Sequence, residues 1–532
     1  MDIKTFKRKF DHASTKKETN WKELYREAME LYSPQRENFD YNVSGERKGR
    51  RVYTSAPYIA LDKAANNIQS SLTPHMKKWV QMKAGRNIPE ENREQAELNL
   101  QDIRDTLFDF IFASNFDLAA SEFYKDIIIG TSAMLVTGTA KEPLMFTTVP
   151  LNELYIATGP MGTIDTVFRK CSMPISGIVK KWDDAKLTDD LVRIEKDDPE
   201  KEVVLIEGTI PKMITVFNPE TEMDEEVDGF GYYVMHEKGE RFLVERDMPV
   251  SPWIVSRWSV LSGEEWGRGP AIVALNDAKT LNQFIKLHMQ SMEVTVHPMF
   301  TAVDDGVINI SNIRIGPGKI IPVSANDGAF GATLKELRVG GNFNVGQMEI
   351  QRLETSINDQ LYTQPLGPLT LPVKTATEVS IRQQELSKRI GSAFARLQYE
   401  FIKPLINLCL YQLDRMGKIN MNNYRVDGHT IAIEAVSPLA QSQSQDEINN
   451  VTRYVEFAMG VFGPEVALSM MKPEEIMAFM SNQLNVPAKI KMTDADKAKA
   501  RQMLEQLSAQ QQMQQQPQQA PQGNPNGQPT QI

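Results

Sequence analysis

Two helical repeats joined by a short β-like segment constrain the fold of this chain more than any other feature. From Pro270 to Val296 the apolar side chains recur every three or four residues, which predicts a helix about 40 Å long. Pro298 ends this helix, because proline removes a backbone hydrogen bond. The pattern returns over Val345–Tyr362, and Met299–Val339 has the short runs of strands. The sequence therefore predicts two antiparallel helices with a small β module at their tip.

The region before this helix pair is predicted to be helical first and β-rich afterwards. Up to about residue 140 it is mainly helical, with helices over 57–72 and 89–112. Residues 133–259 change to the alternation of strands, Met145–Ala157 being one strand-like run, and one helix over Pro174–Trp182 interrupts them. We therefore expect an α+β fold.

The region after the helix pair returns to helix. Residues 363–377 hold three prolines and cannot be helical, whereas 378–415 form the longest helical repeat, on the order of 55 Å, which Pro404 is expected to kink. A short strand follows, and then predicted helices over 444–460, 464–471, 473–484 and 494–507. Residues 509–532 are rich in Gln, Pro and Gly, which predicts a flexible tail.

The composition indicates an acidic protein with an ordinary apolar core. The 532 residues are 41% hydrophobic and carry a formal net charge of −10. Because Lys and Arg supply the affinity for phosphates, the chain is not expected to grip DNA tightly. No window is apolar enough for a membrane span, and the N-terminus lacks the apolar core of a secretory signal. Cys171 and Cys409 indicate no disulfide framework, so a reducing cytoplasm is the default compartment.

The loop "SGEEWGRGP" before the first long helix looks like a phosphate site but lacks the chemistry of one. A helix N-terminus after glycines can bind an anion, yet the Lys-Ser/Thr pair of a P-loop is absent, and Glu264 and Glu265 would repel a nucleotide. No histidine has a partner at metal-ligand spacing, and no nucleophile motif occurs. We expect no cofactor, no metal and no catalysis. Methionines such as Met289 and Met292 either fill a core or form an adaptable subunit interface.

Several separate blocks of sequence, in a fixed order, resemble one known family. The blocks are Trp21–Phe39, Arg51–Met82, "GEEWGRGPAIVALNDAKTLNQ" at Gly263–Gln283, and Thr375–Ile406. Together with the order of helices and strands, they are similar to the portal, or head-to-tail connector, proteins of short-tailed bacteriophages. The resemblance extends over Trp21–Gly460.

The resemblance implies a mainly helical portal fold with wing, stem, clip and crown regions. Residues 1–260 would form the wing, 261–297 and 345–362 the two stem helices, 298–344 the clip, 363–377 the tunnel loop, 378–440 the long kinked helix with a wing strand, 441–508 the crown helices, and 509–532 the tail.

The resemblance also implies what such a chain does. About twelve copies would form a ring at one capsid vertex, the conduit through which double-stranded DNA is packaged and ejected without being held tightly. The implied partners are terminase, a tail adaptor, the major capsid protein, scaffold and internal core proteins, with no membrane. The protein would be assembled in the host cytoplasm and reside in the virion. The alternatives are another capsid-assembly protein, such as a shell or scaffolding protein, and a terminase-like packaging enzyme.

Particular residues take expected roles on this interpretation. Gly267, Gly269 and Pro270 would make the turn from wing to stem, since glycine has no Cβ and proline presets φ at a helix start. The tunnel loop would present Gln364, Leu366, Leu369, Leu371 and Lys374 to the DNA, with the leucines as a narrow collar and Lys374 touching phosphate. Proline-rich loops also serve simply as spacers.

The remaining candidates lie on the two helices and the tip. Lys279, Lys286 and Arg352 would face the lumen, or else form salt bridges between subunits or a solvated outer face, because helix phase does not decide which side is inside. Ile313, Arg314, Lys319 and Ile320 would form the docking surface of the clip.

Overall fold

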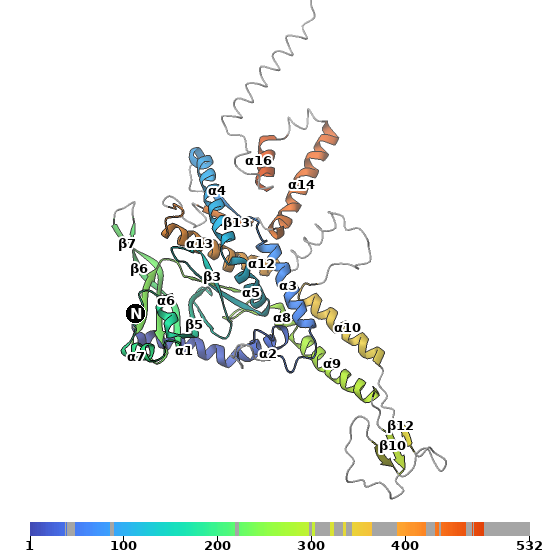
Figure 1. Cartoon of the computed structure of the whole chain (residues 1–532). Coiled ribbons are helices and arrows are strands. Elements are labelled where there is room, and N and C mark those ends of the chain that lie inside the picture. The colour runs from blue at the N-terminus through green and yellow to red at the C-terminus, as the bar shows by residue number, and fades with distance from the viewer. Residues whose placement is uncertain are drawn as a thin grey trace, which may run out of the picture.

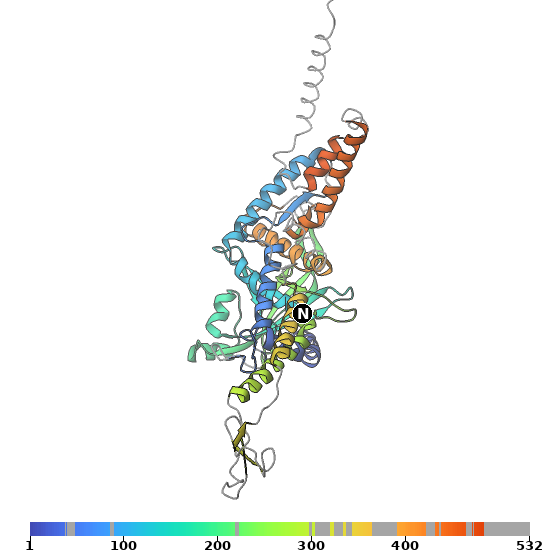
Figure 2. The same cartoon turned by 90° about the vertical axis from the view of Figure 1, so that its right-hand side faces the viewer.

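The computed structural model has the α+β architecture predicted from the sequence (Figure 1). It describes residues 1–37, 39, 48–85, 90–218, 223–296, 300–303, 320–323, 334–336, 343–363, 391–421, 431–435, 438–463, 471 and 473–483. Figures 1 and 2 show an elongated molecule in which a helix pair projects from one end of the body. Within the described ranges, no helix is both long enough and apolar enough to span a bilayer.

Five helices from the first quarter of the chain build much of the core. They are α1 (Ile3–Asn20), α2 (Lys22–Tyr32), α3 (Ala56–Leu72), α4 (Glu90–Ala113) and α5 (Phe116–Ile129). The helices predicted over 57–72 and 89–112 are α3 and α4. Buried side chains such as Tyr25, Leu61 and Phe123 join α2, α3 and α5 in the main hydrophobic cluster. This cluster is the base from which the helix pair extends.

The β-rich region forms two antiparallel sheets. The strands β2 (Thr131–Thr137), β3 (Met145–Val149) and β9 (Trp253–Arg257) lie in the order β3-β2-β9. The strands β4 (Leu154–Thr158), β5 (Ile164–Pro174), β6 (Glu202–Asn218), β7 (Met223–His236) and β8 (Phe242–Met248) follow each other in a five-stranded sheet. The predicted run Met145–Ala157 is therefore divided between two sheets, because a turn at residues 151–153 separates β3 from β4.

Two short helices, α6 (Ile175–Lys181) and α7 (Asp189–Asp197), lie between β5 and β6. The prediction of a single helix in this region was wrong. Helix α7 is nine residues long and packs on the body through Leu191 and Ile194, so its apolar repeat covers a single turn and is too short to be detected as a helix.

The predicted helix pair with a small sheet at its tip is present (Figure 1). The first helix begins as α8 (Pro270–Val273) and continues after Ala274 as α9 (Leu275–Val296). The second is α10 (Phe343–Gln360). At the tip, β10 (Phe300–Val303) pairs in parallel with β11 (Ile320–Val323) and antiparallel with β12 (Leu334–Glu336).

The C-terminal helices return to the body. Of the helix predicted over 378–415, the structure describes α12 (Gly391–Leu397), a π-helical turn (Gln398–Ile402) and α13 (Lys403–Arg415). The strand β13 (Ile431–Ala435) pairs with β1 (Val80–Ala84), and α14 (Pro438–Phe462) and α16 (Pro473–Gln483) follow. The predicted helix 494–507, the tail 509–532, and 464–471 apart from its last residue lie outside the described residues.

Candidate functional site at the base of the helix pair

The chain passes from β9 into α8 through a turn in which two stretches of backbone come into close contact. A Cβ atom at Gly267 would lie 2.3 Å from the carbonyl oxygen of Gly130. A Cβ atom at Gly269 would lie 1.9 Å from the carbonyl oxygen of Ile128. The backbone of Gly269 is extended, with φ −96° and ψ 172°, so it is close approach and not a left-handed conformation that requires glycine here.

Hydrogen bonds fix this turn to the body. The Tyr25 hydroxyl donates to the carbonyl oxygen of Gly267 at 2.6 Å, and the Gly267 N–H donates to the Thr131 hydroxyl at 2.8 Å. The Gly269 N–H donates to the carbonyl oxygen of Ile129 at 2.9 Å, and Pro270, which has no N–H, starts α8. The turn therefore uses its backbone donors to anchor α8 and does not offer them to a phosphate.

Arg257, the last residue of β9, ties the turn to the C-terminal helices. Its side chain is 3% exposed, and its Nη2 donates to the Glu400 carboxylate at 2.7 Å while its backbone N–H donates to the same carboxylate at 2.9 Å. The guanidinium also donates to the carbonyl oxygens of Glu265 at 3.1 Å and Gly162 at 3.2 Å. Arg396 adds a second cation to Glu400 at 3.0 Å. A buried ion pair needs such additional hydrogen bonds to offset its desolvation.

The next residue, Trp258, contacts the roots of both long helices. Its N–H donates to the carbonyl oxygen of Gly130 at 2.9 Å, beside the turn that starts α8. Its ring stacks on Tyr362, just after α10, with a centroid distance of 6.3 Å. The end of β9 is thus a junction that fixes α8, α10 and the π-helical turn relative to one another.

A buried lysine supports the junction from α1. The Lys17 ammonium donates to the carbonyl oxygens of Leu151, Asn152 and Leu154, in the turn before β4 and at its first residue, at 2.5, 2.9 and 2.7 Å. It also lies 4.2 Å from the ring centroid of Tyr155 and 5.5 Å from that of Trp266, which belongs to the turn. Burial lowers the pKa of Lys17 to about 7, because desolvation disfavours the charged form.

The helices of the pair pack closely against each other. A Cβ atom at Gly346 of α10 would lie 2.9 Å from the Nδ1 atom of His288 on α9. Nearer the body, the Asp277 carboxylate accepts hydrogen bonds from Ser356 at 2.8 Å and from Gln360 at 2.7 Å. These contacts hold α9 and α10 together as one projecting unit.

The three predicted lumen cations have partners within their own chain. Lys279 forms a salt bridge with Glu27 on α2, and the Lys286 ammonium lies 5.5 Å from the ring centroid of Tyr53. Arg352 is 68% exposed and is paired with a glutamate three residues earlier on α10. Two of the three cations therefore contact the body of the same subunit. Which of them face a lumen stays a prediction.

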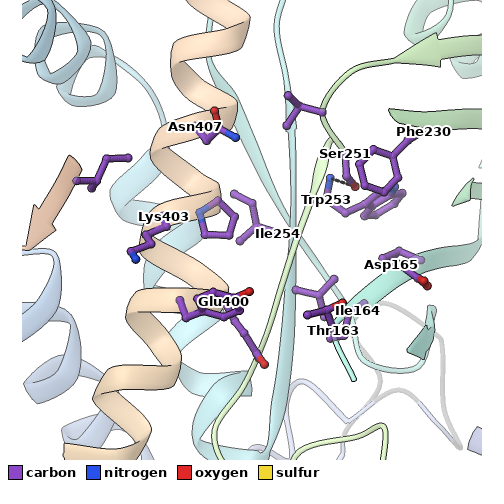
Figure 3. Close-up of a pocket in the computed structure, with 16 residues that line it drawn as sticks. Thr163, Ile164, Asp165, Phe230, Ser251, Trp253, Ile254, Glu400, Lys403 and Asn407 are labelled. Carbon is purple, nitrogen blue, oxygen red and sulfur yellow. Dashed lines mark hydrogen bonds between the residues drawn. The ribbon is translucent and has the colours of Figure 1, made fainter. Parts of the chain in front are cut away.

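Pro404 lies at the start of α13, directly after the π-helical turn. Proline has no N–H for the carbonyl of Glu400 four residues earlier, and a π-helical turn is one way a helix accommodates such a break. The sequence predicted a kink at this position, and the structure places the π-helical turn there. A cavity of about 580 Å³ separates this turn from β5 and β9 (Figure 3).

Most of the predicted loop residues lie outside the described part of the chain. These are the tunnel-loop residues Gln364, Leu366, Leu369, Leu371 and Lys374, and the docking residues Ile313, Arg314 and Lys319. Ile320 is described and begins β11. The roles assigned to all of these residues stay predictions.

Burial shifts the pKa of several titratable groups in the described part of the chain. No cluster of three or more His, Cys, Asp or Glu in the described ranges is arranged to hold a metal ion. Burial raises the pKa of Asp126 to about 6, although Arg36 pairs with this carboxylate at 3.0 Å. Burial also raises the pKa of the Cys171 and Cys409 thiols, which lowers their thiolate fraction at neutral pH.

Sequence reasoning missed the junction residues Arg257, Glu400 and Lys17. Arg257 and Glu400 are 143 positions apart, and nothing in either segment points to the other. Lys17 could have been identified from the sequence, because it continues the buried stripe of Phe6, Phe10 and Ala13 on α1. A lysine at the next position of an apolar stripe indicates a buried charge with dedicated partners.

Comparisons with known proteins identify the class to which this architecture belongs. A family model described as bacteriophage head to tail connecting protein matches residues 4–491, so the chain belongs to that family. The resemblance to portal proteins inferred from the sequence is thereby confirmed.

Named relatives agree with this assignment. The chain is 22% identical over 476 residues to the probable portal protein of Bordetella phage BPP-1, and the aligned region covers 86% of this chain and 82% of that protein. It is 21% identical over 364 residues to the portal protein of Salmonella phage epsilon15, covering 66% of this chain and 64% of that protein. Among solved structures, a chain from the virion of a native gene transfer agent particle has a TM-score of 0.34 at 9% identity, covering 83% of this chain and 89% of that one.

Proposed function

We propose that this connector assembles with identical copies into a closed ring of about twelve at one vertex of a phage capsid, with DNA passing through its centre. The observation that carries the proposal is an uncovered apolar stripe on the projecting helix α9. Near the body, Leu275, Ala278 and Leu281 on this stripe are buried. Further out, Met289 and Met292 continue the same face and are 56% and 48% exposed.

An apolar stripe that continues beyond the body indicates a partner. The described residues leave about half or more of Met289, Met292 and Val296 exposed, and α10 adds exposed Val345 and Met348. Exposed apolar groups that gather along one projecting element mark interaction sites more often than scattered single residues do. Neighbouring helix pairs, side by side around a ring, would cover these side chains.

The regions are assigned accordingly. The wing comprises residues 1–260, the stem 261–297 and 345–362, and the clip 298–344, with 363–377 as the tunnel loop. The long helix and wing strand of 378–440, the crown helices of 441–508 and the tail of 509–532 complete the subunit. The junction at Arg257 and the Gly267–Pro270 turn then holds the stem at a fixed angle to the wing.

The charges support a conduit and not a clamp. The chain has a net charge of −10, and Lys279 and Arg352 are neutralised by carboxylates of their own chain. A channel lined by an acidic ring with few unpaired cations repels phosphate, so DNA can move through it without being held. The ring carries out no reaction and binds no cofactor or metal. It docks terminase during packaging and a tail adaptor afterwards, and contacts the major capsid protein, scaffold and internal core proteins. Assembly takes place in the host cytoplasm, and the mature ring resides in the virion.

Ring assembly tests the proposal. Purified wild-type protein is expected to show rings with a central hole in negative-stain images, and Met292→Glu is expected to abolish them because it places a charge in the stem interface. Met213→Glu is the matched control, since Met213 is similarly exposed on β6, which lies across the body from the helix pair (Figure 1). Both variants should keep the circular dichroism of the wild type. Equal ring formation by the two variants would contradict a stem interface.

A further inference from the structure

The helix α5 and the π-helical turn form a layer with two opposite outer faces. They pack through Phe123 and Phe401, whose rings stack with a centroid distance of 4.3 Å. On α5, Leu118 lies five residues before Phe123, which places it about 140° around the helix. On the π-helical turn, Tyr399 is two residues before Phe401 and points the other way, since Phe401 is buried and Tyr399 is 61% exposed. Leu118 and Tyr399 therefore lie on opposite sides of the layer.

An apolar knob stands on the first of these faces. It consists of Leu118, which is 76% exposed, and Met76, which is 62% exposed. A contact between the side chains of His75 and Asp117, the residues that precede them, holds the two segments together. Met76 has a φ of 56°, a left-handed conformation that residues other than glycine rarely adopt. Such strain concentrates at functional positions, and here it presents a methionine to the outside.

The cavity beside the π-helical turn lies on the second face. Figure 3 shows Glu400, Lys403 and Asn407 from the helix opposite Ile254 and Trp253 from β9. Its volume of about 580 Å³ falls within the range of sites that bind ligands, and its walls are mainly apolar. Tyr399 and Pro404 line it as well.

The charges near the knob and the cavity are complementary. Lys77, next to the knob, is exposed; its neighbour Lys78 pairs with Asp105, whereas no carboxylate of the described residues pairs with Lys77. Asp165, at the wall of the cavity, accepts a hydrogen bond from the neighbouring Thr166 hydroxyl, and none of the described cations pairs with it. Lys403 also lines the cavity, and Glu400 there is already paired with Arg257 and Arg396. One chain thus carries an apolar projection beside Lys77 on one face, and on the other a largely apolar hollow where Asp165 is the carboxylate without a cationic partner among the described residues.

We propose that the knob of one subunit inserts into the cavity of the next, with Lys77 pairing with Asp165 across the interface. The inference deepens the proposed ring and rests on it. A projection and a hollow on opposite sides of the same chain give a head-to-tail contact, and this kind of contact closes into a ring when its rotation allows. A second copy is the occupant because it supplies both the apolar volume and the opposite charge.

Disulfide cross-linking tests the contact. In the double variant Leu118→Cys/Tyr399→Cys, each copy can link to both neighbours, so oxidation is expected to give a ladder of covalent oligomers on a non-reducing gel. Mixing the two single variants should stop at covalent dimers. The native Cys171 and Cys409 are buried and supply no background. The pair Leu118→Cys/Met213→Cys, with Met213 exposed on β6, is the geometric control and should give no ladder.

The outcomes separate this inference from the ring itself. If Leu118→Cys/Tyr399→Cys is poorly folded, Met76→Cys/Lys403→Cys tests the same contact from other positions. A ladder in either pair, absent from the control, supports the inference. Rings in micrographs with no ladder from either pair overturn it and leave the ring in place. Wild-type protein that forms no ring overturns the proposed function and this contact together.

Discussion

Replacing Gly269 by alanine tests whether the turn into the helix pair depends on close backbone approach. The new Cβ atom would lie 1.9 Å from the Ile128 carbonyl oxygen and 2.5 Å from its carbon, so backbone has to move. Overpacking of this kind costs about 1–3 kcal/mol. If the Gly269 N–H loses its bond to Ile129 and stays buried, a further penalty of about 1–3 kcal/mol follows. The free energy of unfolding is therefore expected to fall by about 1–6 kcal/mol, with the larger losses if that hydrogen bond breaks.

The matched control is the same substitution at Gly460. This glycine lies in α14 and has no atom within 4 Å of its would-be Cβ. Alanine is favoured over glycine inside a helix by about 0.5–1 kcal/mol, so Gly460→Ala is expected to stabilise slightly. Urea unfolding followed by circular dichroism, together with limited proteolysis at the base of α8, measures both variants. A Gly269→Ala protein as stable and as protease-resistant as the wild type would refute the close-approach argument.

Three further predictions concern the buried charges and thiols. The unfolded chain keeps the Lys17 proton up to about pH 10, whereas the folded chain loses it near pH 7. Between these pH values the free energy of unfolding of the wild type should therefore rise by about 1.4 kcal/mol per pH unit relative to that of Lys17→Met. Parallel stability–pH curves for the two proteins would contradict the burial of that charge. Glu400→Gln leaves Arg257 buried without its carboxylate, so the free energy of unfolding should fall by about 3–5 kcal/mol and amide exchange over 398–415 should become faster. Arg396 is the more exposed partner of Glu400, so Arg396→Gln should lower the free energy of unfolding by less than about 1 kcal/mol. Equal losses in these two variants would argue against a buried pair. Cys171 and Cys409 should not react with a thiol reagent in the native protein and should both react in guanidinium, and prompt native labelling would disprove their burial.

Much of the fold could be predicted from local pattern. The apolar repeat of α9 and α10, and the prolines at 270 and 298, placed the helix pair because each signal lies within the segment that it describes. The alternation over residues 133–259 predicted a β-rich region for the same reason, and β5, β6 and β7 lie within it.

The features that sequence reasoning missed depend on distant partners. The strand β1 forms by pairing with β13, which lies about 350 residues further along the chain. The Met145–Ala157 run looked continuous in the sequence because its division between two sheets depends on pairing with distant strands. At the junction, the glycines predicted to make the turn do form it. Glycine is required there because the backbone of Ile128–Gly130 packs against the turn, and no local pattern in the sequence reveals this contact.

A cryo-electron microscopy reconstruction of the purified assembly would show whether the projecting helix pairs enclose a channel. We expect a closed ring in which α9 and α10 of every subunit line a central bore and the strands β10, β11 and β12 lie at its mouth. Compact monomers, or a ring whose projecting helix pairs splay outward and enclose no channel, would contradict it.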